Sequence, residues 1–255
     1  MLPPFLWIVV AGLLCACCSE AFAAGETASR RVQRGWQAGA IALVSNGGYA
    51  GSSRRQLVVP AAAYEGEHAF LRGLQLGWHA WQRDDWRLDL VAQARLDGFD
   101  ADDIPLDGLR DRRRSMDVGA VLTRSGRLGN LQLTVLTDAL SRSRGQELAL
   151  QYGHPLRFGK WRVTPGLGVR WWSPRLADYY YGIHPSEAAN GAPGPYAVRG
   201  VLVPEASLGA VAPMGRRWTF WSALKYQRLP RAITDSPLVE RSSASTVLAG
   251  FVYAF

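Results

Sequence analysis

The dominant pattern in this sequence is strict alternation of apolar and polar residues. Residues 161–172 read WRVTPGLGVRWW, in which every second position from Trp161 to Trp171 is apolar. Arg162, Thr164 and Arg170 lie at positions between them, together with two glycines. A period of two over a dozen residues predicts a β-strand with one apolar face.

Eleven segments of the chain fit this pattern. Several are ten to twelve residues long, which exceeds the ~5 to 6 residues usual in soluble sheets and matches the ~9 to 11 that cross a bilayer. No apolar run of 18 or more residues follows residue 24, so helical membrane spans are not expected. The pattern therefore predicts an all-β protein, an antiparallel transmembrane β-barrel. The segments are residues 36–44, 56–64, 72–81, 86–96, 116–124, 131–137, 147–152, 161–172, 198–212, 218–227 and 243–255.

An odd number of strands is not expected, because bacterial single-chain barrels have even numbers. We therefore expect twelve strands, with ten as the alternative, and one strand missed or misread in the N-terminal third. Short turns alternate with long connections near residues 97–115, 173–196 and 229–242, as in outer-membrane barrels. No linker divides the chain, so residues 24–255 are predicted to form one barrel domain.

Residues 1–23 have the features of a signal peptide. An apolar run from Phe5 to Cys18 is followed by Ala21 and Ala23, a small-x-small cleavage site. A lipoprotein signal ending before Cys17 is the alternative. All three cysteines lie within this leader, so disulfides and thiolate metal sites are not expected in the mature chain.

The net charge of +8 becomes +9 once the leader, with Glu20 as its one charged residue, is removed. No nucleic-acid-binding motif accompanies this charge, and the basic residues are scattered over turns, so nucleic acid is not an expected partner. Outer-membrane lipid and the phosphorylated sugars of lipopolysaccharide are the expected anions for an exported chain.

Aromatic residues lie mostly at strand ends, where their rings would form girdles at the lipid headgroups. The ten tryptophans include Trp78, Trp86, Trp172, Trp218 and Trp221. The alternative is an ordinary aromatic core.

The chain closes on STVLAGFVYAF, with Phe251, Tyr253 and Phe255 at alternate positions. This terminal aromatic pattern is expected to face lipid and to act as the assembly signal that the barrel assembly machinery recognises.

Known catalytic motifs are absent from the sequence. His68, His79, His154 and His184 have no metal-ligand spacing, and no Gly-x-Ser-x-Gly motif is present. A Ser, His and Asp set assembled from different strands, with His79 or His154 as base, is the alternative to the prediction that this is not an enzyme. No cofactor or metal is expected.

Charged residues of both signs fall on the predicted inward faces of the strands. Opposite charges inside a narrow barrel would pair across the lumen, because an unpaired buried charge is costly. Mixed signs favour a filled lumen, suited to a scaffold, over a wet and anion-preferring pore. The residues are Arg87, Asp89, Arg95, Glu147, Arg162, Arg170 and Lys225.

Several segments resemble the MipA/OmpV family of outer-membrane proteins. They include LADYYYGIHPSEA from Leu176, LKYQRLPRAITDSPLVE from Leu224 and the closing GFVYAF. The N-terminal third departs from the family, because SNGGYAGSSRRQ stands where an acidic loop is usual. The resemblance implies an outer-membrane barrel, in some members a scaffold joining a murein-degrading lytic transglycosylase to a murein-synthesising penicillin-binding protein. Other members resemble surface antigens or adhesins.

Two groups of residues are candidates for contacts with partners. Tyr179, Tyr180 and Tyr181 form either a ligand-binding loop tip or a cluster packed over the barrel mouth. Basic turns would dock murein enzymes if they face the periplasm, through Arg157, Lys160, Arg216 and Arg217. The leading hypothesis is a structural scaffold, with an anion-leaning pore and a surface adhesin as alternatives.

Overall fold

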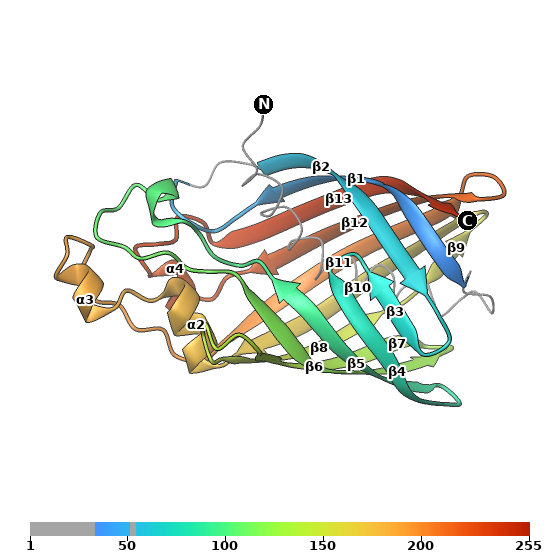
Figure 1. Ribbon diagram of the computed structural model, residues 1–255, viewed down its shortest axis with the longest axis horizontal. Helices are drawn as coiled ribbons and strands as arrows, with labels where there is room; N and C mark the ends of the chain where they lie inside the picture. Colours follow the sequence, from blue (N-terminus) through green and yellow to red (C-terminus); the bar gives the residue numbers. More distant parts are fainter. Residues whose placement is uncertain (1–33, 52–54) are drawn as a thin grey trace.

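The computed structural model describes residues 34–51 and 55–255, which form a closed antiparallel β-barrel (Figure 1). The sheet has thirteen strands, and the pairing of β10 with β11 closes it into a circle. Strand β9 pairs only with β10, along the same edge of β10 as β8. Strands β8 and β9 therefore share one place in the wall, and twelve strands make up the wall. The prediction of a twelve-stranded barrel is confirmed. The strands are β1 (Gly35–Asn46), β2 (Arg55–Glu65), β3 (Ala69–Arg72), β4 (Gln75–Arg83), β5 (Trp86–Arg95), β6 (Ser115–Gly126), β7 (Gly129–Asp138), β8 (Gln146–Gly153), β9 (Leu156–Phe158), β10 (Trp161–Trp172), β11 (Val201–Pro213), β12 (Trp218–Arg228) and β13 (Ser243–Ala254).

The strand that the sequence pattern missed is β3. Residues 72–81 were predicted as one strand, but a two-residue turn separates β3 from β4, with Arg72 opposite Gln75. Gly73 makes this turn with a φ of 61°, a conformation that glycine adopts without strain. The turn places Arg72 and Gln75 on the same face and so shifts the phase of the alternation, and the four residues of β3 are too few to establish a period of two on their own.

The two faces of each strand differ as the alternation predicts. On β13, Val247 and Phe251 point outward and are 45% and 48% exposed, whereas Leu248 and Val252 are buried inside the barrel. The outer face of β13 therefore presents an apolar surface to lipid.

Most tryptophans lie on the outer wall, as the girdle hypothesis predicts. Trp36, Trp78 and Trp218 are all exposed on the outside. Trp172 and Trp221 are exceptions and are buried. Each follows an outward-facing neighbour, Trp171 or Phe220, and adjacent strand residues point to opposite faces.

The two rims of the barrel differ in length of connection. At one rim, the turn rim, two to four residues join most strands. The two ends of the barrel sequence also meet at this rim, because Phe255 N donates to Trp36 O at 3.2 Å and β1 begins where β13 ends. The long connections gather at the opposite loop rim, with the helices at the far end of the barrel from the C-terminus (Figure 1). In outer-membrane barrels the short turns face the periplasm, so the loop rim faces the outside of the cell. The helices are η2 (Ala101–Asp103), α2 (Pro174–Tyr181), α3 (Pro185–Ala188) and α4 (Arg231–Thr234).

Within the described ranges, none of the helices has the length and apolar character that a membrane-crossing helix needs.

Candidate functional site

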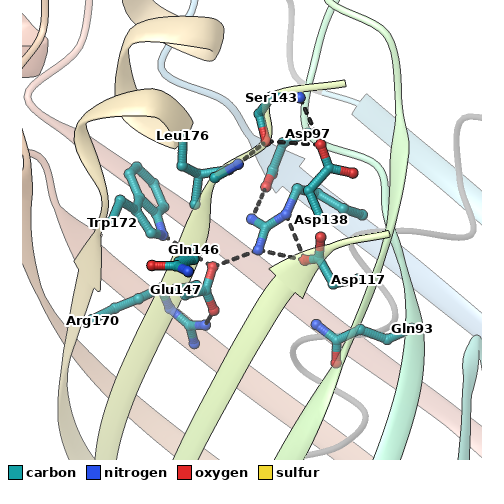
Figure 2. Close-up of polar contacts among 12 residues, drawn as sticks. Gln93, Asp97, Asp117, Asp138, Ser143, Gln146, Glu147, Arg170, Trp172 and Leu176 are labelled. Atoms are coloured by element: carbon teal, nitrogen blue, oxygen red, sulfur yellow. Dashed lines mark hydrogen bonds and ion pairs between the residues drawn. The ribbon is translucent and has the colours of Figure 1, made fainter. Parts of the chain in front are cut away.

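A belt of ion pairs lies inside the barrel, near the loop rim. Arg95 on β5 donates from Nε to Asp117 Oδ2 at 2.7 Å, and from Nη2 to Glu147 Oε2 at 2.7 Å (Figure 2). Asp117 lies on β6 and Glu147 on β8, so the Arg95 side chain crosses the inner faces of β6 and β7. It also bonds Asp97 at 2.9 Å, at the start of the loop that follows β5.

The belt continues along the next strands. Arg170 on β10 pairs with Glu147, and its Nε lies 3.3 Å from Glu205 Oε2 on β11. Lys225 on β12 lies 3.2 Å from the same Glu205 oxygen. We call Arg95, Asp117, Glu147, Arg170, Glu205 and Lys225 the ion-pair belt.

Burial explains why every member of the belt is paired. The six side chains are at most 10% exposed, and a buried charge without a partner is strongly destabilising. Acidic and basic groups alternate along the belt, so each carboxylate contacts at least one cation. These low exposures show that solvent barely reaches the belt, which obstructs this part of the lumen.

A second polar cluster follows β2 to β5 on the inner wall. His79 Nδ1 lies 2.6 Å from Asp89 Oδ1, and its Nε2 lies 2.9 Å from Glu65 Oε1. Arg72 and Arg87 bond the remaining oxygens of these carboxylates at 3.0 Å and 2.9 Å. Both ring nitrogens of His79 are therefore engaged by carboxylates, which leaves none to activate a serine.

The other histidines make local contacts. The His68 ring stacks on Trp78, with ring centroids 5.4 Å apart. His154 Nδ1 contacts Leu128 O at 3.0 Å at the turn rim, and His184 begins helix α3. Among residues 34–51 and 55–255, no group of three or more His, Cys, Asp and Glu could hold a metal ion.

The long connections fold over the outer mouth of the barrel and form a loop cap. Ser173 starts α2 by accepting a hydrogen bond from Leu176 N, and Pro174 occupies the first turn, where its missing N–H is not needed. Helix α2 then buries Leu176, Ala177 and Tyr180. They pack with Ile183 and Val198 of the same connection and with residues of other connections, including Phe99, Ile233 and Leu238.

The three consecutive tyrosines lie in this loop cap. Tyr180 is 3% exposed, and Tyr181 stacks between Tyr49 and Trp172 with ring centroids 5.4 and 5.8 Å away. The Tyr179 hydroxyl accepts a hydrogen bond from Arg113 N at 3.0 Å. Burial raises the pKa of Tyr181, so this ring stays neutral. Of the two arrangements expected from sequence, the structure places them as a cluster packed over the barrel mouth.

One buried ion pair joins two long connections of the loop cap. Arg112 donates from Nη1 and Nη2 to Glu187 Oε1 and Oε2 at 2.8 and 2.9 Å, and from Nη2 to Gly182 O at 3.0 Å. Glu187 also accepts from the backbone N–H groups of His184 and Arg110. Burial raises the pKa of Glu187, but these hydrogen bonds outweigh burial and lower it to about 2.

The predicted docking residues lie at the turn rim. Arg157, Lys160, Arg216 and Arg217 are all exposed, and Arg217 Nη1 donates to the Tyr253 hydroxyl at 2.8 Å. Exposed Arg124 and Arg127 extend this basic surface.

The opposite side of the turn rim is more acidic. Its two turns, after β2 and after β4, carry exposed Glu67, Asp84 and Asp85. Exposed Arg83 lies 3.7 Å from Asp84, so this side carries charges of both signs with an acidic excess, opposite the basic half of the turn rim.

The remaining predicted sites concern export and assembly. Phe251 and Tyr253 point outward on β13, and Phe255 is 77% exposed at the turn rim. The cleavage residues Ala21 and Ala23 lie outside the described residues, as does the whole predicted signal peptide.

Several members of these clusters were not identified from sequence. Asp117 and Glu205 occupy inward positions of the alternating strands β6 and β11, so the period of two could have found them. Arg112 and Glu187 lie in long connections without periodicity, 75 residues apart, and no sequence signal joins them.

Comparisons with known proteins agree with this architecture. The family model described as MltA-interacting protein MipA matches residues 38–255. A protein of Escherichia coli K12 that is described as an outer-membrane protein, YiaT, is 30% identical over 85% of this chain and 89% of its own. The MltA-interacting protein of the same strain is 29% identical over 77% of this chain and 81% of its own.

The chain is also distantly similar in structure to two solved outer-membrane proteins. The translocator domain of the autotransporter NalP from Neisseria meningitidis has a TM-score of 0.47 at 13% identity, covering 93% of this chain and 94% of its own. An outer-membrane channel from Pseudomonas putida F1 has a TM-score of 0.45 at 12% identity, covering 88% and 97%.

Proposed function

Since the chain belongs to the MipA family of outer-membrane β-barrel proteins, we propose that it acts as a closed scaffold that docks murein enzymes on its periplasmic turn rim. The observation that carries this proposal is the filled lumen. The ion-pair belt occupies the interior with side chains at most 10% exposed, and the loop cap packs an apolar cluster over the outer mouth. A barrel obstructed at two levels is suited to holding partners rather than to conducting ions.

The basic half of the turn rim is the proposed docking surface. Arg157 lies on β9 and Lys160 on the turn that follows it, and Arg216 and Arg217 lie on the turn between β11 and β12. Arg124 lies near the end of β6, and Arg127 on the turn between β6 and β7. Exposed charges of one sign steer and orient a partner of opposite charge. We expect this partner to be a lytic transglycosylase of the kind that MltA-interacting protein is named for, and a penicillin-binding protein to join it.

Charge reversal tests the docking surface. Changing Arg157, Lys160, Arg216 and Arg217 to Glu should abolish recovery of the lytic transglycosylase in pull-downs from outer-membrane extracts, because like charges would face each other. Wild-type recovery should also fall as salt is raised, since exposed charges are screened.

A matched control reverses four exposed arginines outside the turn rim: Arg142, Arg199, Arg231 and Arg241. This variant should retain the transglycosylase. Equal recovery by both variants, with both folded, would contradict docking through the basic half.

The second candidate function is a pore, and one observation favours it. A cavity opens in the half of the lumen nearer the turn rim, below the ion-pair belt. A pore would require the belt to rearrange, which conductance can detect.

A further inference from the structure

Three exposed arginines lie on neighbouring chain segments of the loop rim, beside β8, β10 and β11. Arg144 lies in the connection between β7 and β8, Arg175 in the first turn of α2, and Arg199 just before β11. We call Arg144, Arg175 and Arg199 the arginine patch.

The connection before β8 lies directly against the start of α2. Gln146 N donates to Ser173 Oγ at 2.9 Å, and Ser173 N donates to Gln146 O at 3.0 Å. Gly145 lies so close to Leu176 that a Cβ atom on Gly145 would be 2.7 Å from Leu176 N. The two segments are therefore in backbone contact.

The segment before β11 contacts the start of α2 as well. A Cβ atom on Gly200 would lie 3.4 Å from Pro174 Cδ. Each arginine of the patch is the direct chain neighbour of a residue that makes one of these contacts. The arginine patch therefore forms one continuous surface, although its members are far apart in the sequence.

The charge of the arginine patch is not neutralised within the protein. In residues 34–51 and 55–255, none of its three guanidinium groups forms an ion pair or a hydrogen bond. The nearby carboxylates of Asp138 and Asp178 accept hydrogen bonds from backbone N–H groups instead. The three cations are thus available to an external anion.

The outer wall next to the arginine patch is apolar. Leu148 on β8, Val169 on β10 and Leu202 on β11 point outward and are 42%, 37% and 59% exposed. Arg199 is three residues from Leu202, at most about 11 Å along the chain. The patch therefore lies where the lipid-facing wall ends at the loop rim, at the level of the headgroups of the outer leaflet.

We propose that the arginine patch binds the phosphate groups of a bisphosphorylated glycolipid of the outer leaflet, the lipid A part of lipopolysaccharide. Arginine binds phosphate through two parallel N–H···O bonds and stays charged at any physiological pH. The acyl chains of the same molecule would lie along the apolar wall. Several cations suit a headgroup with more than one phosphate better than a phospholipid headgroup. This site lies on the rim opposite the proposed docking surface and does not depend on it.

Fluorescence anisotropy of labelled lipid A, titrated with the folded, purified barrel in a nonionic detergent, tests the site. Changing Arg144, Arg175 and Arg199 together to Gln should weaken binding about tenfold, as the loss of three exposed ion pairs does. Lipid A without its phosphates should bind the wild-type protein about as weakly. Phosphatidylglycerol should compete poorly with lipid A.

The matched control changes three exposed loop-rim arginines at the other side of the barrel to Gln: Arg228, Arg231 and Arg241. The connection between β12 and β13 also carries exposed Asp235 and Glu240, so these arginines do not form a uniformly basic surface. The control variant should bind lipid A as the wild-type protein does. All variants should show the band shift on boiling that marks a folded barrel.

Three results would show that the proposal is wrong: equal weakening by both triple variants, equal binding of lipid A with and without its phosphates, or equally tight binding of phosphatidylglycerol. If the triple variant does not fold, the comparison of lipid A with its dephosphorylated form on the wild-type protein decides the matter. The charge-reversed turn-rim variant should still bind lipid A, which separates this proposal from the docking function.

Discussion

Arg170 lies between two carboxylates of the ion-pair belt, those of Glu147 and Glu205. Its side chain is 10% exposed, and both carboxylates are nearly buried. The attraction within such a group mainly offsets the cost of removing the charges from water. The belt is therefore maintained by its complete set of partners, and the loss of one member should affect the others.

Arg170→Ala should destabilise the barrel, because it removes one cation from between two buried carboxylates. We expect the free energy of unfolding to fall by roughly 3 to 5 kcal/mol, as when one partner of a buried ion pair is removed. Urea unfolding in detergent, followed by tryptophan fluorescence, measures this. The control Arg241→Ala removes an exposed loop arginine and should change stability by no more than about 0.5 kcal/mol. Equal stability of both variants would contradict the buried network.

Glu187 should make the loop cap sensitive to acid. Its pKa is about 2 in the folded protein against an ordinary value of 4.5, so its contribution to stability is complete above pH 4.5. That contribution is lost as the pH falls from 4.5 towards 2, because the protonated acid no longer holds Arg112. Hydrogen exchange in residues 174–188 should accelerate within this window. In Glu187→Gln the acceleration should be absent; an identical pH profile would show that another group controls the loop cap.

Among the strands, β13 has a special position because it closes the barrel against β1 and carries the C-terminal aromatics. Its outward Phe251 packs against Phe220 of β12 with ring centroids 5.2 Å apart. Tyr253 contacts both Trp218 and Phe255 at 5.2 Å. The predicted assembly signal is thus also part of the aromatic surface at the turn rim.

Deleting Phe255 should reduce assembly more than it reduces stability. Phe255 is 77% exposed, so little burial is lost with it, whereas the terminal aromatic of the proposed signal is removed. The folded fraction in outer membranes, measured as the band that shifts on boiling, should fall several-fold. Val247→Ala, an outward change on the same strand, should assemble normally. Normal assembly of the deletion variant would contradict the assembly role.

The strands were predictable because each has one lipid-facing side, which fixes a period of two. The wall strands longer than eight residues all appeared in the pattern, whereas the four residues of β3 are too few to show a period of two, and the turn after them shifts its phase. Inward charges such as Arg95 and Glu147 were predictable for the same reason. The Arg112–Glu187 pair was not, because its residues come from two connections whose approach depends on the folded loop cap.

Considered as a whole, the molecule is a barrel with different contents at different depths. The loop cap covers the outer mouth, the ion-pair belt follows below it, and the cavity and the charged turn rim face the periplasm. The basic half of the turn rim and the lining of the cavity are both formed by the part of the wall from β6 to β12. The basic half of the turn rim therefore lies on the periplasmic side, where a scaffold for murein enzymes would need it.

Conductance in planar lipid bilayers tests the closed barrel most directly. The purified protein should first show the band shift on boiling that marks a folded outer-membrane barrel. We then predict no steady current at moderate voltage, because the ion-pair belt and the loop cap obstruct the lumen at two levels. Stable, reproducible current steps from the wild-type protein would contradict the closed scaffold and would favour a pore.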